Sequence, residues 1–104
     1  MGQFVYNGTV YMDVADDILG YLEAVIGAKF RLKQPFYLSW RFSPGTGESR
    51  TTVWLTPPVP LQYRYSTRDP RTLNPDKLRE LMTQAHTAAG LLLVVDPSGH
   101  AVFE

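Results

Sequence analysis

The chain has 104 residues, and its 10 Lys and Arg residues balance its 10 Asp and Glu residues. This length favours one compact domain over residues 1–104, because domains cluster at about 100–150 residues. A content of 44% hydrophobic and 19% charged residues argues against a disordered chain. The absence of cysteine excludes disulfides, cysteine-ligated metals and thiol nucleophiles.

The sequence carries no targeting signal at its start and no stretch approaching about 18 consecutive apolar residues. We therefore expect a cytoplasmic protein without membrane association.

The first elements are a predicted hairpin and helix. Asn7-Gly8 lies between two β-rich runs, which predicts a type I′ turn that places Tyr6 opposite Thr9. The apolar spacing then predicts a helix over about 16–30, with Asp13, Asp16 and Asp17 supplying its N-cap and first-turn charge. Two glycines inside this helix, Gly20 and Gly27, suggest close packing against a neighbouring element.

The middle of the chain reads as a three-stranded meander over 36–66. Its strands are Phe36–Phe42, Arg50–Leu55 and Leu61–Tyr65, and a rigid proline-rich loop connects the last two. A second helix follows, with Asn74 as N-cap, Pro75 at its first position and Gly90 as the residue that ends it.

The last elements complete the predicted order. The apolar run Leu91–Val95 predicts a buried strand, and His100–Glu104 predicts a short edge strand or a tail. The expected fold is a single α+β domain of order ββαβββαβ, with an antiparallel sheet and two helices packed on one face.

Charge is unevenly distributed along the chain. All 10 basic residues lie between Lys29 and Arg79, where only three acidic residues occur, and the two flanks are acidic. The neutral total therefore does not exclude a local face that binds anions.

Strand alternation sorts the meander into two faces. The inward face holds Phe36, Leu38, Trp40, Phe42, Val53, Leu55, Leu61, Tyr63 and Tyr65. The outward face combines aromatic and basic side chains, and its candidate binding residues are Tyr37, Arg41, Arg50, Trp54 and Arg64. Such a face could stack bases and contact phosphates. The alternative is that arginines cover the rings in solvent or at a contact with another protein or a second copy.

Catalytic patterns are weak. His86 lies beside the apolar stripe of the second helix and His100 lies near the C-terminus, and neither has a local Ser or Cys partner. Three acidic residues at a helix start are typical of capping rather than of a metal site. Gly45-Thr46-Gly47 joins two strands, so no helix dipole follows it as phosphate binding requires. We expect no metal and no cofactor.

The whole chain resembles a family of small actinobacterial proteins. The matching stretches are Met1-Gly2-x-Phe4-x-Tyr6-Asn7-Gly8-Thr9, Asp17-x-Leu19-x-x-Leu22-x-x-Val25-Ile26-x-x-Lys29-Phe30-Arg31, Phe36-Tyr37-Leu38-Ser39-Trp40, Thr52-Val53-Trp54-Leu55, Pro60-Leu61-Gln62-Tyr63-Arg64-Tyr65, Leu73-Asn74-x-x-x-Leu78 and Gly90-Leu91. Members often carry the label ATP-dependent DNA ligase. Ligation needs a lysine in a Lys-x-Asp-Gly motif, and none of the three lysines of this chain stands in one. The resemblance implies a family fold and a loose association with nucleic acid.

Three functional hypotheses follow. The first is a non-enzymatic interaction module that binds a protein partner, or a second copy, through the aromatic and arginine face. The second is a nucleic-acid-binding accessory protein linked to DNA metabolism. The third is a small hydrolase or transferase built on His86 and the acidic cluster of Asp13, Asp16 and Asp17.

Overall fold

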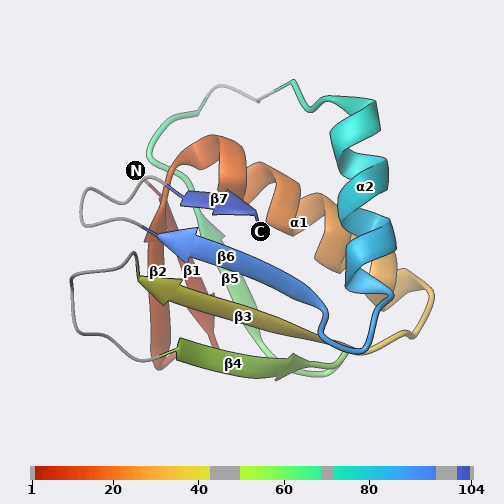
Figure 1. The fold of residues 1–104 in the computed structure, drawn as a ribbon. Helices are drawn as coiled ribbons and strands as arrows, with labels where there is room; N and C mark the ends of the chain where they lie inside the picture. The colour runs from red at the N-terminus through yellow and green to blue at the C-terminus, as the bar shows by residue number, and fades with distance from the viewer. Residues whose placement is uncertain (1, 43–49, 69–71, 96–100, 104) are drawn as a thin grey trace.

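The computed structural model describes residues 2–42, 50–68, 72–95 and 101–103 (Figure 1). Its elements are, in chain order, β1 (Gly2–Tyr6), β2 (Val10–Val14), α1 (Asp16–Arg31), β3 (Phe36–Phe42), β4 (Arg50–Leu55), β5 (Leu61–Arg64), α2 (Pro75–Ala85), β6 (Leu91–Val95) and β7 (Ala101–Phe103). The predicted α+β class and element order are confirmed. The segment near the C-terminus forms an edge strand rather than a tail.

The strands form two sheets where the sequence predicted one. One sheet has the order β2-β1-β5 and the other β4-β3-β6-β7, in which β3 and β6 run parallel. The predicted meander therefore breaks after β4, and β5 pairs with β1 instead. The proline-rich loop makes this transfer, and the amide of Asn7 donates to the carbonyl of Pro60 at 2.8 Å. The apolar β6 pairs with the other edge of β3, so β4 stays at the edge of the sheet and both edges of β6 are paired.

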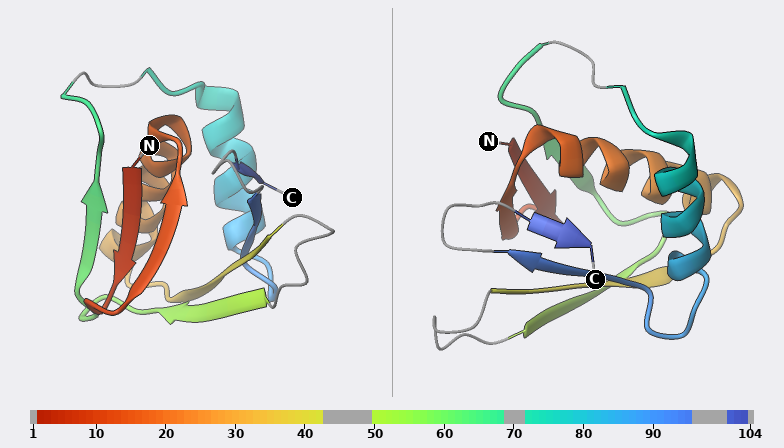
Figure 2. Two further views of the ribbon diagram at one scale, coloured as in Figure 1. Left: turned by 90° about the vertical axis from the view of Figure 1, so that its left-hand side faces the viewer. Right: turned by 45° about the horizontal axis from the view of Figure 1, so that its top comes forward.

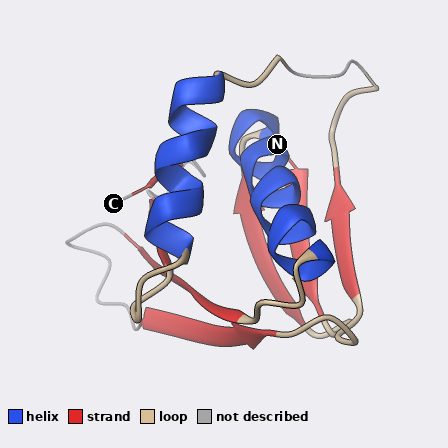
Figure 3. Ribbon diagram, turned by 90° about the vertical axis from the view of Figure 1, so that its right-hand side faces the viewer, coloured by secondary structure: helices blue, strands red, loops and turns tan. Residues whose placement is uncertain are grey.

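Both helices lie on the inner side of the two sheets (Figures 2 and 3). The sheets meet through Phe4 of β1 and Trp40 of β3, whose rings pack edge to face at 6.5 Å. The residues predicted to face inward from β3 and β4 are buried, namely Phe36, Leu38, Trp40, Val53 and Leu55. The side chain of Phe42 lies outside the described set. One core therefore joins both sheets and both helices.

The first hairpin has the predicted turn but a different register. Asn7 and Gly8 both have positive φ, and the amide of Thr9 donates to the carbonyl of Tyr6, as a type I′ turn requires. Tyr6 nevertheless pairs with Val10, because Thr9 is an extra residue in the connection. This shift by one residue places Met12 on the same buried face as Phe4.

The start of α1 differs from its prediction. Ala15 is the N-cap and makes no side-chain hydrogen bond, so the expected aspartate cap is wrong. Asp16 instead lies buried, and its carboxylate accepts hydrogen bonds from Ser66 and Thr67 after β5. The Asp16 side chain therefore connects the start of α1 to the segment after β5 instead of capping its own helix.

The start of α2 is as predicted, and its end is not. Asn74 accepts from the amides of Asp76 and Lys77 at 2.8 and 3.2 Å, with proline at the first helical position. The helix ends at Ala85, and residues 86–89 form turns before Gly90. Gly90 therefore does not end the helix. Its positive φ of 72° and its lack of a side chain instead let its backbone pass close to that of Tyr37 in β3.

The glycines inside α1 do not mark close packing. A Cβ at Gly20 would lie 3.4 Å from Leu73 Cδ2, and one at Gly27 would lie 3.5 Å from Arg31 Nη1, which are ordinary contacts. The expected tight neighbour is absent at both positions.

We expect Gly20→Ala to raise the free energy of unfolding by about 0.5–1 kcal/mol, because alanine restricts the unfolded chain and favours the helix. Urea denaturation of the variant and the wild type measures this change. Gly27→Ala is the matched case and should give a similar gain. A loss at Gly20 alone would show that Leu73 cannot accommodate the added methyl group.

Candidate functional site

The outer face of the β4-β3-β6-β7 sheet carries most of the predicted binding residues. Tyr37 and Trp54 are cross-strand partners whose ring centres lie 4.7 Å apart at an interplanar angle of 58°. They remain 44% and 46% exposed. Two large rings held together in solvent are unusual for a sheet surface and favour an interaction site.

The rest of this face has a regular layout. Ser39 and Thr52 are paired next to the rings, and their hydroxyl oxygens are 2.8 Å apart. Arg41 and Arg50 form the following pair on the same face. Three aliphatic residues extend the surface across the other two strands, namely Leu92, Val94 and Val102. We call this set the sheet face. None of its residues is acidic.

The first hairpin does not cover the sheet face. Its buried side packs from within, where Phe4 contacts Trp40. The Tyr6 hydroxyl reaches the end of β4, where it donates to the backbone carbonyl of Trp54 at 3.2 Å. That bond fixes the strand that carries the exposed indole.

Arg64 lies elsewhere. It is exposed on β5, pairs with Gln3 and belongs to the β2-β1-β5 sheet. The structure therefore brings four of the five candidate residues together and removes Arg64 from the set. The reason is the sheet change at the proline-rich loop.

The residues of the hydrolase hypothesis lie at opposite ends of α1. Asp16 and Asp17 begin this 16-residue helix, which is about 24 Å long. His86 lines a cavity with Lys33 beyond the other end of the helix. Among the described residues, no group of three or more His, Cys, Asp or Glu side chains could hold a metal. His100 and Gly45-Thr46-Gly47 fall outside the described ranges.

One cavity that sequence reasoning missed lies where both helices end and β3 begins. It has a volume of about 500 Å³, and Tyr37 and Trp54 belong to its wall. Lys29, Lys33 and His86 supply its basic groups. We call it the basic cavity. It required two helix ends far apart in sequence to meet, so no local pattern could reveal it.

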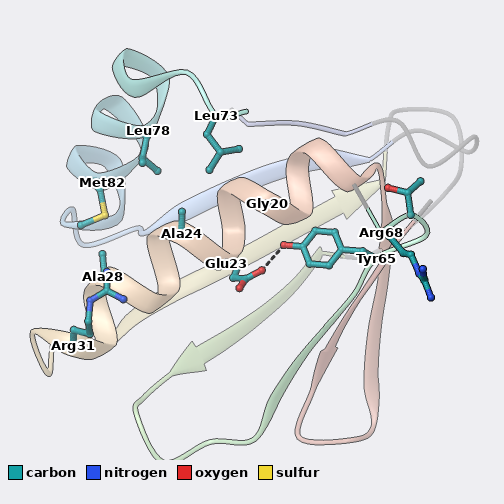
Figure 4. A pocket seen from close by; sticks show the side chains of 11 residues that line it. Gly20, Glu23, Ala24, Ala28, Arg31, Tyr65, Arg68, Leu73, Leu78 and Met82 are labelled. Carbon is teal, nitrogen blue, oxygen red and sulfur yellow. Dashed lines mark hydrogen bonds between the residues drawn. The ribbon is translucent and has the colours of Figure 1, made fainter. Parts of the chain in front are cut away.

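A second cavity, the interhelical groove, runs between α1 and α2 and measures about 630 Å³ (Figure 4). Gly20, Ala24 and Ala28 lie along α1, four residues apart, and leave the space open. Leu73, Leu78 and Met82 form the opposite apolar wall. The spacing of these small residues, four apart along the predicted helix, is the sequence pattern that could have indicated the groove.

A tyrosine and a glutamate line one side of the groove. The hydroxyl of Tyr65 donates to Glu23 Oε1 at 2.5 Å. Burial raises the pKa of Tyr65, and the bond to Glu23 raises it further, so the phenol stays protonated. The sequence placed Tyr65 on the core face, whereas it is 38% exposed beyond the end of β5.

Comparison with family models shows which family the chain belongs to. The model of a domain of unknown function, DUF7882, matches residues 1–96. The chain belongs to the DUF7882 family. No curated protein and no solved structure matches this DUF7882 chain. Within the described part of the chain, neither helix has the length and apolar character needed to cross a membrane.

Proposed function

We propose that this DUF7882 chain is a non-enzymatic interaction module that pairs with a second copy of itself through the sheet face. One observation carries the proposal. The aromatic pair and the arginine pair lie at equal register distances on either side of Ser39 and Thr52. The face is therefore complementary to the same face of a second copy whose strands run in the opposite direction.

Two-fold symmetry makes use of this layout. A pair of identical chains usually contacts through the same patch on each. A two-fold axis that lies in the interface, over Ser39 and Thr52 and along the line that joins them across the two strands, lays the rings of one copy over the guanidinium groups of the other. A guanidinium over an aromatic face contributes about 0.5–2 kcal/mol, and each such contact occurs twice in the pair.

Two further properties support a second copy as the partner. The chain has a formal net charge of zero, so two copies do not repel one another at long range. The aliphatic residues Leu92, Val94 and Val102 add apolar surface beside the polar layout. Apolar area of this kind is buried by a protein partner and has no role in stacking bases.

Size-exclusion chromatography with light scattering tests the pairing. We expect the wild type to approach twice the chain mass of 11.8 kDa as its concentration rises. Trp54→Ala removes a ring from both halves of the contact. Arg50→Glu replaces a cation that stacks on a ring of the other copy with an anion. Each variant should weaken the dimer by about 10- to 100-fold, equivalent to about 1.4–2.7 kcal/mol.

Arg64→Glu is the matched control, because Arg64 is exposed and lies in the other sheet. It makes the same charge change as Arg50→Glu and should leave the dimer intact. A wild type that stays at 11.8 kDa across the concentration range would contradict the proposal. So would an equal loss of dimer in Arg50→Glu and Arg64→Glu.

Single-strand nucleic acid binding is a second candidate. The exposed Trp54 ring near the basic pair Arg41 and Arg50 favours it, because bases stack on aromatic rings and phosphates bind arginine. This candidate function is the one that agrees with the link to DNA metabolism implied by the ligase label. A monomeric wild type that binds single strands, with an affinity that falls steeply with salt, would support it over pairing.

A further inference from the structure

Lys29 is a buried cation whose partners carry no charge. The residue is only 3% exposed, although it is a lysine near the end of a surface helix. Its ammonium donates to Gln34 Oε1 at 3.1 Å and lies 5.8 Å from the centre of the Phe36 ring. Within the described part of the chain, no carboxylate pairs with it. A buried charge without a counter-charge is costly, so the site favours an added anion.

The end of α1 does not need this ammonium as a cap. Backbone amides already occupy three of the last four carbonyls of the helix. Leu32 donates to Ala28, Lys33 donates to Phe30 and Gln34 donates to Lys29, at 3.2, 3.0 and 2.9 Å. Two of the three donors of the Lys29 ammonium therefore remain for another acceptor.

The basic cavity places a second lysine and an imidazole beside Lys29. Lys33 and His86 line the same space, and no lining residue is acidic. The paired rings of Tyr37 and Trp54 line the cavity as well. A volume of about 500 Å³ suits a small organic molecule.

We propose that the basic cavity binds a small molecule in which an aromatic ring is joined to a carboxylate or a phosphate. The anionic group lies against Lys29 and Lys33, where compact ammonium groups attract it from two sides. The ring of the ligand packs against Tyr37 and Trp54 in an offset or edge-on arrangement. This site goes beyond the pairing of two chains, because its basic residues lie outside the sheet face.

Titration calorimetry with defined probes tests the cavity. The probes are 4-hydroxyphenylacetate for the carboxylate and uridine monophosphate for the phosphate, and they show which anion the site prefers. Phenol and inorganic phosphate each supply only one half of the chemistry and should bind at least about 10-fold more weakly than the better probe. Quenching of tryptophan fluorescence gives a second signal, because Trp54 belongs to the cavity wall.

Lys33→Gln is the main variant, because Lys33 is exposed and its loss leaves the core unchanged. It should weaken the better probe by about 10-fold. Lys29→Gln should weaken it further, with circular dichroism verifying its fold. Lys77→Gln removes a lysine outside the cavity and should bind as the wild type does.

Two results would overturn the proposal. One is the absence of saturable binding of both aromatic anions at about 1 mM. The other is an equal affinity of Lys33→Gln and Lys77→Gln for the better probe. Neither result affects the pairing proposal, which depends on Arg50→Glu. The titrations are performed on Arg50→Glu as well as on the wild type, so that dimer formation does not compete for Tyr37 and Trp54.

Discussion

Gly90→Ala should lower the free energy of unfolding by about 3–5 kcal/mol, because it combines backbone strain with overlap of atoms. Gly90 is buried and has a φ of 72°, a conformation in which a side chain is strained. A Cβ at this position would overlap the carbonyl oxygen of Tyr37 and lie 2.8 Å from its carbonyl carbon. Tyr37 cannot retreat, because β3 is held between β4 and β6.

Gly8→Ala separates these two contributions. Gly8 has a nearly identical φ of 75°, and a Cβ there would meet no atom within 4 Å. We expect this variant to lose about 1–2 kcal/mol from strain alone. Urea denaturation of both variants measures the difference. Equal losses would show that the approach of Gly90 to Tyr37 is not a tight contact.

The position of Gly90 also connects the fold to the sheet face. The glycine leads into β6 and supports the backbone of Tyr37, whose ring packs on Trp54. A larger residue would clash with the backbone of β3 at the position that carries one ring of the aromatic pair. The glycine is therefore a positioning residue for the exposed rings as well as a requirement of the core.

Local patterns predicted the elements and the N-cap of α2, although not the N-cap of α1 or the end of α2. The 16–30 helix was expected within one residue of the observed Asp16–Arg31, and Asn74 begins α2 as expected. Strand pairing was not predictable in the same way. The alternation of β5 is equally compatible with a place beside β4 or beside β1, and the choice depends on contacts between residues distant in sequence.

The candidate residues illustrate the same distinction. Tyr37, Arg41, Arg50 and Trp54 were grouped correctly, because β3 and β4 are consecutive strands whose alternation fixes their faces. Arg64 was grouped wrongly, because that placement assumed the third strand of the meander. Nothing in the local sequence pattern marks Lys29 as a site residue, and only the tertiary structure shows that it lines a cavity with Trp54.

Asp16→Ala should lower the free energy of unfolding by about 2–3 kcal/mol. The carboxylate accepts from the amides and the hydroxyls of both Ser66 and Thr67, at 3.0 to 3.4 Å. Alanine would leave these donors without their acceptor and would release the segment after β5 from the start of α1. Urea denaturation measures the loss. Asp17→Asn is the control, because Asp17 is exposed in the same helical turn, and it should cost less than about 1 kcal/mol.

The contribution of Asp16 should also depend on pH. Burial raises the pKa of this carboxyl, but the hydrogen bonds from Ser66 and Thr67 outweigh burial and hold the pKa below its ordinary value. Because the pKa is lower in the folded state than in the unfolded state, the stabilisation is present above about pH 4 and is lost as the pH falls through the folded-state pKa. Asp16→Asn keeps an acceptor but cannot ionise. Its unfolding free energy should therefore fall less between pH 7 and pH 3 than that of the wild type, and equal slopes would show that Ser66 and Thr67 do not favour the charged form.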